Sequence, residues 1–403
     1  MIQIAVMGYG TVGSGVVEVI NTNQASINKK AGEEINVKYV LDLRDFPGDP
    51  IESKLVHDFE VIVNDPEVKI VVEVMGGINP AYTFTKRCLE AGKSVCTSNK
   101  ELVAKHGAEL LELAKSKNLN YLFEASVGGG IPIIRPLNSS LTADEIEEIT
   151  GILNGTTNYI LSKMTFEGLD FASVLKDAQQ KGYAELHPEA DVEGYDACRK
   201  IAILTSLASG QQVDFEDIYT EGITKITAED IQYAKKMGMA VKLLASSKKV
   251  DGKFYAMVAP FLIDVQNPLY SVNGVFNAIF ARGNVLGDVM FYGSGAGKLP
   301  TASAVVADVV DAARHLKRNI MTFWSSQKLE LGDIQNSQCR FFVRVKGAAA
   351  DVKEMEALFG AVEVVDAGLA GEYGFVTGEF TEKEFAELAA KTDVVLNRIR
   401  MKA

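Results

Sequence analysis

The chain has 403 residues, more than one ordinary hydrophobic core accommodates, which predicts two or three domains. Hydrophobic residues make up 47% and charged residues 23%, a balance typical of a folded globular protein. The net charge of −12 disfavours nucleic acid as a partner, because phosphate binding needs a basic surface. Apolar runs are interrupted by glycine or charge before they reach the length of a bilayer span, so no membrane partner is predicted.

The start of the chain and its cysteines both favour a cytoplasmic protein. A strand pattern begins at residue 2, without the basic region and cleavage site of a signal peptide. The cysteines lack the spacing of metal ligands and indicate free thiols in a reducing compartment. They are Cys88, Cys96, Cys198 and Cys339.

Residues 1–130 alternate short β-rich runs with helical stretches, which predicts an α/β domain built on a parallel sheet. Helices are expected from the glycine turn through Ile20, over 81–91 and over 110–117. A polar loop is expected before the second strand. Strands are expected at residues 2–6, 37–41, 61–63, 70–74, 94–97 and 121–124.

The rest of the chain divides into two further domains. Residues 131–299 mix helices with strands at 146–153 and 254–263, and predict an α+β domain for substrate binding and dimerisation. An amphipathic helix over 300–318 is expected to pack back onto the first domain, and 319–336 read as a polar linker. Residues 337–403 follow a strand–helix–strand–strand–helix–strand order, typical of a small ferredoxin-like domain. The expected elements are 340–345, 352–359, 362–365, 374–377, 382–390 and 394–399.

A glycine-rich turn at Gly8, Gly10 and Gly13 joins the first strand to the first helix. The first glycine permits a tight turn, the second lets the backbone approach a pyrophosphate, and the third allows the helix to pack against the strand. Because the Gly-x-Gly-x-x-Gly spacing occurs between a predicted strand and helix, it predicts a Rossmann fold that binds NAD or NADP.

The end of the second strand should meet the ribose of this cofactor. Asp42 favours the 2′-hydroxyl of NAD, whereas Arg44 suits the 2′-phosphate of NADP. Asp42 is equally well explained as a cap of the strand end. The sequence favours neither cofactor.

Carboxylates and a lysine gather between residues 182 and 200. Lys200 falls on the apolar face of a predicted helix, with Asp196 one turn before it on the same side. A lysine on a buried face needs a partner. An ordinary helical ion pair explains this spacing as well as an active site does.

Four segments, in the same order, closely resemble the signature of homoserine dehydrogenases and span about the first 320 residues. They are Ser98-Asn99-Lys100, Asn154-Gly155-Thr156-Thr157-Asn158-Tyr159-Ile160-Leu161, the run from Gly182 to Lys200, and Gly293-Ser294-Gly295-Ala296-Gly297 with Pro300-Thr301-Ala302. One departure is His187, where the family usually has Asp; it replaces no residue assigned to the chemistry.

The resemblance implies NAD(P)-dependent interconversion of L-homoserine and L-aspartate 4-semialdehyde, in threonine, methionine and isoleucine biosynthesis. It implies that Lys200 gives and takes the proton, that Asp191 orients a water or Lys200, and that Lys100 lies beside the cofactor and the reacting centre. The implied substrate ligands are Glu185, Asp196 and Thr156. The implied cofactor-binding residues are Gly8, Gly10, Thr11, Val12, Gly13, Gly76, Lys100, Gly182 and Gly297.

The resemblance also implies a structural sodium site and an oligomer. The sodium would be held by a carboxylate and main-chain carbonyls, although a hinge without an ion is nearly as good a reading. The implied ligands are Glu124, Val127, Gly129 and Ile131. The oligomer would be a homodimer or homotetramer built through the second domain.

The C-terminal domain resembles an ACT domain, a small-molecule sensor. Such domains usually carry a Pro-Gly-Val-Leu turn after the first strand, whereas residues 346–351 read Lys-Gly-Ala-Ala-Ala-Asp. Feedback by threonine and a purely structural or dimer-forming role are therefore both open.

Two other functions compete with this interpretation. An aldehyde dehydrogenase acting on aspartate semialdehyde would need a nucleophilic cysteine, but Cys96 lies in a predicted strand and Cys198 on a helix without a paired histidine. A nucleotide-sensing regulator on a degenerate dehydrogenase scaffold predicts loss of the acid–base residues. Lys100, Glu185, Asp196 and Lys200 are all present, which disfavours it.

Overall fold

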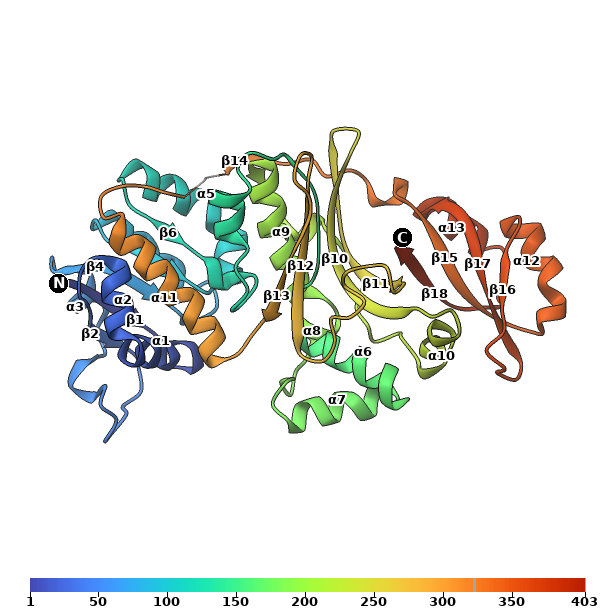
Figure 1. Ribbon diagram of the computed structural model, residues 1–403, viewed down its shortest axis with the longest axis horizontal. Coiled ribbons are helices and arrows are strands. Elements are labelled where there is room, and N and C mark those ends of the chain that lie inside the picture. The colour runs from blue at the N-terminus through green and yellow to red at the C-terminus, as the bar shows by residue number, and fades with distance from the viewer. Residues whose placement is uncertain (322–323, 403) are drawn as a thin grey trace.

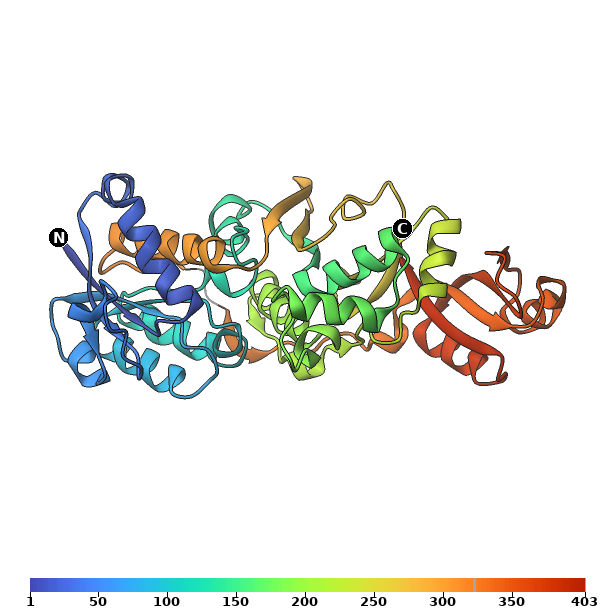
Figure 2. The same ribbon diagram turned by 90° about the horizontal axis from the view of Figure 1, so that it is seen from below.

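The computed structural model describes residues 1–321 and 324–402 and shows an elongated molecule. The first domain, residues 1–130 with the glycine-rich turn (the dinucleotide-type domain), and the C-terminal domain lie at opposite ends, with the second domain between them (Figure 1). The same order along the long axis is visible after a quarter turn (Figure 2). None of the helices in the described ranges is both long and apolar enough to cross a bilayer.

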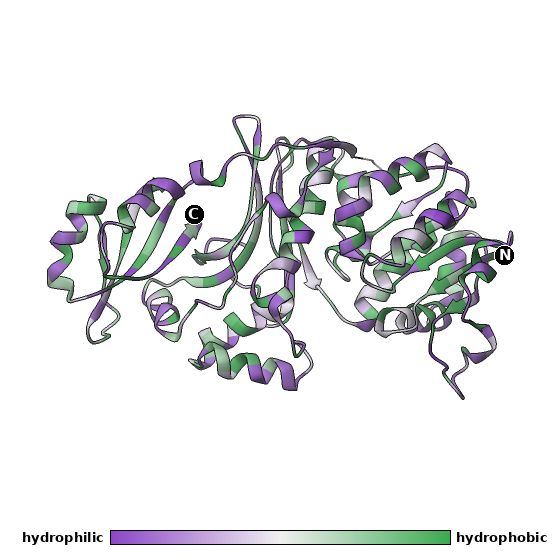
Figure 3. Cartoon of the chain, turned by 180° about the vertical axis from the view of Figure 1, so that it is seen from behind, coloured by the Kyte–Doolittle hydropathy of each residue, from purple (hydrophilic) through white to green (hydrophobic). Residues whose placement is uncertain are grey.

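The first domain is built on a parallel sheet of six strands in the order β3-β2-β1-β4-β5-β6. Apolar residues concentrate in these strands (Figure 3), because both faces of the sheet are covered. The chain reverses direction across the sheet between β1 and β4, and ligands of such sheets bind at the carboxyl ends of the strands there. The strands are β1 (Ile2–Met7), β2 (Ile35–Leu41), β3 (Leu55–Val56), β4 (Val68–Glu73), β5 (Ser94–Thr97) and β6 (Tyr121–Leu122).

Two predictions for this domain were wrong, and one predicted helix is longer than expected. Residues 61–63 belong to helix α3 (Phe59–Val63), because the Asp58 side chain caps the Glu60 N–H and starts a helix in a short apolar run. The polar stretch before β2 contains α2 (Gln24–Ala31), which buries only Ile27 and Ala31. Helix α5 (Lys100–Ser116) begins ten residues before the expected start at 110. The remaining helices are α1 (Thr11–Thr22) and α4 (Ala81–Glu90).

The second domain contributes most of a large, mainly antiparallel sheet, and its longest helix, over residues 195–209, lies between this sheet and the first domain. The two predicted strands are present as β7 (Ile146–Ile152) and β11 (Lys253–Ile263). Additional strands are β9 (Tyr219–Thr220), β10 (Ala240–Val250), β12 (Phe276–Gly283) and β13 (Gly287–Ser294). The helices are α6 (Gly155–Glu167), α7 (Phe171–Gln180), α8 (Glu189–Val192), α9 (Tyr195–Ser209) and α10 (Ala228–Lys236).

The segment after the second domain returns to the first. Helix α11 (Lys298–Arg314) packs on α1, and a Cβ on Gly15 would lie 2.8 Å from the Lys298 carbonyl oxygen. The predicted linker, residues 319–336, contains a strand that packs on the second domain within its described residues. This strand, β14 (Ser325–Lys328), pairs with β8 (Gln211–Gln212). Trp324 is buried against Gly107.

The C-terminal domain has the predicted ferredoxin-like topology, with strand order β18-β15-β17-β16 and its own apolar core. Its last strand also pairs in parallel with β11, so the sheets of the second and C-terminal domains are continuous. Its elements are β15 (Gln338–Lys346), α12 (Val352–Phe359), β16 (Glu363–Val365), β17 (Glu372–Thr381), α13 (Glu382–Ala389) and β18 (Val395–Lys402).

Candidate active site

The glycine turn between β1 and α1 has the geometry of a phosphate cradle. Gly8 has a φ of +99°, and a Cβ on Gly13 would lie 1.9 Å from the Gly8 carbonyl oxygen, so both positions require glycine. A Cβ on Gly10 would meet only open space. Gly10 also begins α1 without a side-chain cap. The first N–H groups of α1, including those of Thr11 and Val12, therefore face outward with a partial positive charge that fits a pyrophosphate.

Asp42 is a structural partner of this turn. Its carboxylate accepts hydrogen bonds from the Tyr9 N–H at 2.8 Å and from the Arg44 N–H at 3.0 Å. The Arg44 guanidinium binds the same carboxylate and holds the pKa of Asp42 well below its usual range, with help from the Tyr9 N–H. The side chain of Arg44 is 63% exposed, whereas that of Asp42 is 10% exposed. The arginine is therefore the more accessible of the two to a cofactor ribose.

Two lysines from different domains meet on one carboxylate. Asp196 lies in the first turn of α9, and its two oxygens are each 2.7 Å from an ammonium nitrogen, Lys100 Nζ on one side and Lys200 Nζ on the other. Lys100 begins α5 at the carboxyl end of β5, so this contact joins the dinucleotide-type domain to the second domain. Burial alone would raise the pKa of Asp196, but the two ammonium groups outweigh it and hold that pKa well below its usual range.

Lys200 is buried, as its place on the apolar face of the helix predicted. Its ammonium donates to the Leu153 carbonyl at 2.8 Å and to Asp196 at 2.7 Å. Because an ammonium carries three N–H donors, one remains for another acceptor. Burial would lower the pKa of Lys100, but the negative charges of Asp196 and Asp191 raise it.

Asp191 joins the cluster through Asn154, which the sequence analysis did not assign. The Asn154 amide donates to Asp191 at 2.7 Å and to Asp196 at 3.0 Å, while its oxygen caps α6 by accepting from the Thr157 N–H. Burial raises the pKa of Asp191 and the negative charge of Asp196 adds to the effect, against the Asn154 hydrogen bond. An asparagine directly after the predicted strand at 146–153 was the available signal, because asparagine is a preferred N-cap.

A second unassigned group, Glu73, ties together the loops that follow β4 and β5. It is fully buried, accepts from the Met75 N–H at 2.8 Å, and accepts from the Thr97 hydroxyl at 2.6 Å. Thr97 in turn accepts from the Asn99 N–H, and the Asn99 amide donates to the Gly77 carbonyl at 2.6 Å. These bonds hold the turn at Gly76 and Gly77 beside the start of α5, where Lys100 lies.

The other predicted ligands lie on loops around this cluster. The Thr156 hydroxyl, on the first turn of α6, donates to the Tyr183 carbonyl at 2.6 Å and anchors the loop that contains Gly182. Glu185 is exposed on that loop, and within residues 1–321 and 324–402 no hydrogen bond or ion pair joins its carboxylate to the cluster. Gly297 precedes α11 with a φ of +117°.

Comparisons with known proteins agree on one family. The sequence model for homoserine dehydrogenase matches residues 132–310, and that for the homoserine dehydrogenase NAD binding domain matches residues 8–124. A homoserine dehydrogenase of Synechocystis sp. is 48% identical over 317 residues, which are 77% of this chain and 73% of that protein. The chain belongs to the homoserine dehydrogenase family.

Solved structures of homoserine dehydrogenases have the same fold. The enzyme from Thiobacillus denitrificans has a TM-score of 0.90 and 34% identity, covering 100% of this chain and 98% of that one. A hyperthermophilic archaeal homoserine dehydrogenase in complex with NADPH has a TM-score of 0.66 and 30% identity, covering 77% of this chain and 97% of that one. The acid–base residues that a degenerate scaffold would lack are present here, so nothing favours the regulatory alternative.

The loop that resembles the sodium site of homoserine dehydrogenases lies around the buried carboxylate of Glu124. Both carboxylate oxygens of Glu124 are occupied by main-chain donors, the N–H groups of Ile133, Ile134 and Arg135, at 2.6, 2.9 and 2.7 Å. Two of these bonds are to Oε1 and one is to Oε2, so about one of the four acceptor positions of this carboxylate stays available. In the part of the chain that the structure describes, no three His, Cys, Asp or Glu side chains form a metal-binding group.

Proposed function

We propose that this protein interconverts L-homoserine and L-aspartate 4-semialdehyde with NAD(P), using Lys200 as the proton donor and acceptor. The observation that carries the proposal is the contact of Lys100 and Lys200 with Asp196, where the carboxyl end of the dinucleotide-type sheet meets the second domain. Ligands of such sheets bind at this edge. The site therefore combines a cofactor cradle with a buried proton-transfer group.

Each residue has a role in the proton balance of the reaction. Bound NAD(P) supplies or accepts the hydride. In the reducing direction the free N–H of Lys200 gives its proton to the aldehyde oxygen as the hydride arrives, leaving a neutral amine and a hydroxyl group. In the reverse direction the neutral amine takes the hydroxyl proton. Asp196 orients Lys200 through their 2.7 Å contact, and Lys100 fixes the other oxygen of Asp196.

Three carboxylates serve the substrate in this proposal. Asp196 retains about one acceptor position for the substrate ammonium after binding Lys100, Lys200 and Asn154, because a carboxylate offers about four. Asp191 accepts from Asn154 with one oxygen, and its other oxygen orients a water or Lys200. Glu185 reaches the substrate from the loop that Thr156 anchors.

Either nicotinamide cofactor fits the ribose end of the cradle. Asp42 is neutralised by Arg44 and does not present an unpaired charge that would repel a 2′-phosphate. The exposed Arg44 guanidinium suits that phosphate. We therefore propose that both NAD and NADP are used, with Arg44 favouring NADP.

The remaining proposals concern assembly and location. We propose a homodimer or homotetramer built through the second domain, where large apolar side chains of β12 and β13 are exposed. A structural sodium ion would be held by Glu124 together with the carbonyls of Val127, Gly129 and Ile131. An ACT-like regulatory role is supported by the ferredoxin-like topology, and a cytoplasmic location by the four free cysteines.

Replacing Lys200 with methionine tests the mechanism. The variant keeps an unbranched side chain but has no proton to transfer, so kcat for homoserine oxidation should fall by at least about 100-fold. Cofactor binding, measured by NADPH fluorescence titration, should change little. Lys249→Met, a lysine on β10 paired with Glu145, is the control and should keep full activity. Near-normal turnover of Lys200→Met would contradict the proposed mechanism.

A further inference from the structure

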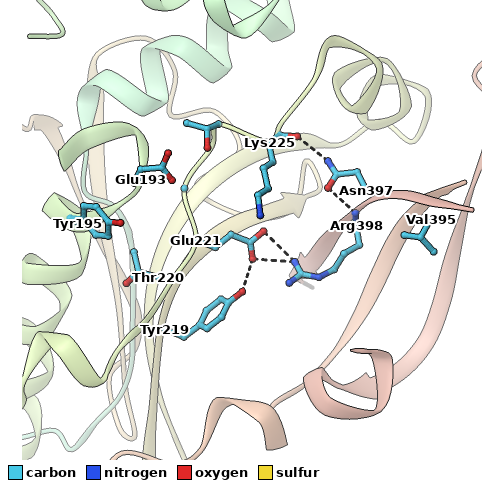
Figure 4. Close-up of a pocket in the computed structure, with 11 residues that line it drawn as sticks. Glu193, Tyr195, Tyr219, Thr220, Glu221, Lys225, Val395, Asn397 and Arg398 are labelled. Carbon is cyan, nitrogen blue, oxygen red and sulfur yellow. Dashed lines mark hydrogen bonds and ion pairs between the residues drawn. The ribbon is translucent and has the colours of Figure 1, made fainter. Parts of the chain in front are cut away.

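Asn277 is an amide side chain without a hydrogen-bond partner beside the proposed active site. It is the second residue of β12 and 2% exposed, and among residues 1–321 and 324–402 neither its amide oxygen nor its amide nitrogen is hydrogen-bonded. By contrast, the Glu221 carboxylate, at the boundary with the C-terminal domain, accepts from Tyr219 and Arg398 (Figure 4). A buried amide without a partner costs free energy, so such a group is expected where a ligand supplies the partner.

Asn277 lies between two glycine-containing segments of the proposed site. A Cβ on Gly155, the first residue of α6, would lie 3.4 Å from Asn277 Oδ1. On the other side, a Cβ on Gly295 would lie 2.0 Å from Asn277 Nδ2, so only glycine fits there. Gly295 belongs to the loop that ends at Gly297, which is expected beside the cofactor. The amide therefore touches both the start of the helix that carries Thr156 and the loop on the cofactor side.

The same amide is close to the group that anchors the proposed proton donor. Strand β12 pairs antiparallel with β7, with Ala278 opposite Ile152, and the next step of this register places Asn277 opposite Leu153. Side chains of opposed residues lie on the same face of a sheet. Because the Lys200 ammonium donates to the Leu153 carbonyl at 2.8 Å, Asn277 lies one strand away from the anchor of Lys200.

The segment that leads into Asn277 is held firmly against α6 and β10. The ammonium of Lys242, a buried residue of β10, donates to the Val272 carbonyl at 2.5 Å. The Asn158 amide of α6 donates to the Phe276 carbonyl at 2.9 Å. These bonds fix the backbone directly before Asn277 in the chain without a ligand. A group placed in advance in this way binds its ligand at a lower entropic cost.

The two free atoms of the amide indicate the chemistry of the ligand. Oδ1 needs a hydrogen-bond donor, whereas Nδ2 needs an acceptor. A substrate ammonium offers donors only, and a substrate carboxylate offers acceptors only. The substrate hydroxyl offers both, but in the proposed reaction it binds Lys200. The carboxamide of a nicotinamide also offers both, and it is attached to the ring carbon next to the one that carries the hydride. It must therefore lie near the reacting centre.

We infer that Asn277 binds the carboxamide of NAD(P), with Oδ1 accepting from its N–H and Nδ2 donating to its oxygen. This inference rests on the proposed NAD(P)-dependent reaction. It adds a cofactor ligand from the second domain to those expected on the first. By holding one substituent of the ring, Asn277 limits rotation of the nicotinamide about the bond to its ribose, and so aligns the hydride with the substrate that Lys200 serves.

Calorimetric titration of the full chain with NAD and NADP, each beside its 3-acetylpyridine analogue, tests this contact. The analogue carries a methyl group in place of the carboxamide nitrogen and cannot donate to Oδ1. The wild type should bind the analogue about tenfold more weakly than the natural cofactor. Asn277→Ala should bind the natural cofactor about tenfold more weakly than the wild type does, and should no longer distinguish it from the analogue. Asn64→Ala, which changes an exposed asparagine after α3, is the control and should repeat the wild-type difference.

A second variant separates this contact from a structural role. Asn277→Leu keeps a similar volume and removes both polar atoms, so it should fold as stably as the wild type and also lose the distinction between cofactor and analogue. If both variants distinguish the two as the wild type does, the inference is wrong while the proposed function stands. A raised KM for homoserine with that distinction intact would assign Asn277 to the substrate and also overturn the inference. If the wild type binds neither NAD nor NADP, the proposed function itself fails.

Discussion

At the scale of single residues, the proposed chemistry depends on Asp196, a buried carboxylate that holds two lysines. It fixes Lys200 within its own helix and Lys100 across a domain boundary, each at 2.7 Å. Losing one partner of a buried ion pair typically costs ~3–5 kcal/mol, because the other charge is left uncompensated. The same carboxylate that contacts the proposed proton donor therefore also fixes the first domain against the second.

Cofactor choice is a second question at this scale. Arg44 is exposed, contacts the largely buried Asp42, and lies over the Phe46 ring at 5.2 Å. In Arg44→Ala the site loses the cation proposed for the 2′-phosphate, so KM for NADP should rise by about tenfold while KM for NAD changes little. Steady-state rates with each cofactor at saturating homoserine measure both values. An equal rise for both cofactors would show that Arg44 acts by supporting the glycine turn and not by contacting the phosphate.

At the scale of elements, β4 and β5 end in one hydrogen-bonded network centred on Glu73. Burial raises the pKa of this carboxyl, and its two oxygens bind one loop each. The network fixes Gly76, expected beside the nicotinamide, relative to Lys100. Because Glu73 is fully buried and bonded to both loops, we expect it to act as a positioning residue, through the loops.

Replacing Glu73 with glutamine should loosen one of the two loops. An amide retains one acceptor oxygen, so only one of the Met75 and Thr97 bonds survives with the same polarity. We expect kcat to fall about tenfold, with a smaller change in cofactor Kd, and the deuterium isotope effect on hydride transfer to increase as that step becomes rate-limiting. Asn120→Asp, another buried polar change in this domain, controls for lost stability. A loss of stability with an unchanged isotope effect would contradict positioning.

Helix α11 carries a carboxyl that should make stability depend on pH. Asp308 accepts from the Glu124 N–H at 2.8 Å and pairs with Arg135 at 2.6 Å. Burial, with the charge of Glu124 nearby, raises its pKa to about 8. Since this exceeds the unfolded value of about 3.9, the folded state binds the extra proton between these values, and stability falls as pH rises through that window.

Urea unfolding between about pH 6 and about pH 8 measures this effect. One proton gives a slope of at most about 1.4 kcal/mol per pH unit. The free energy of unfolding of the wild type should decrease toward pH 8, and Asp308→Asn, which cannot ionise, should show a flatter profile. The same slope in both proteins would show that Asp308 is ionised throughout the window.

Elements with strong local patterns were predictable from the sequence, and those set by distant contacts were not. The glycine turn, α1 and the ferredoxin-like order follow from spacing alone. The predicted strand at residues 61–63 was wrong because a short apolar run suits a strand and a helix equally well. The Asp58 cap is what favours the helix. In the site, Lys200 and Asp196 share a helix and were paired correctly. The contact of Lys100 with Asp196 and the roles of Asn154 and Glu73 depend on elements that meet only in the folded chain.

At the scale of the whole molecule, the second and C-terminal domains form one continuous structure. The pairing of β18 with β11 extends the sheet across the boundary. Buried ion pairs reinforce it: Arg344 lies 2.8 Å from Asp230, and Lys402 lies 2.5 Å from Glu148. The C-terminal domain is therefore docked on the second domain by strand pairing and by ion pairs.

The opposite edge of the same sheet, strand β13, is the surface proposed for self-association. Met290 and Tyr292 are 42% and 54% exposed there, and Tyr292 stacks on Phe276 of β12 with ring centroids 5.3 Å apart. Exposed apolar side chains on an edge strand are a typical surface for pairing with a second copy. Met290→Glu should weaken the dimer by about 100-fold or more, because a buried charge would lack a partner.

Sedimentation velocity over a concentration series measures this dissociation. Leu43→Glu is the matched control, because Leu43 is 91% exposed on the first domain, away from β13. We expect wild type and Leu43→Glu to sediment alike as oligomers, and Met290→Glu to dissociate at concentrations where both remain assembled. If Met290→Glu sediments with the mass of the wild-type oligomer at every concentration, β13 is not the interface. If the dissociated variant is active, self-association and catalysis, the two functions proposed for the second domain, are independent. This is the expected result, because the Lys100–Asp196–Lys200 cluster lies within one chain and does not need a second copy to form.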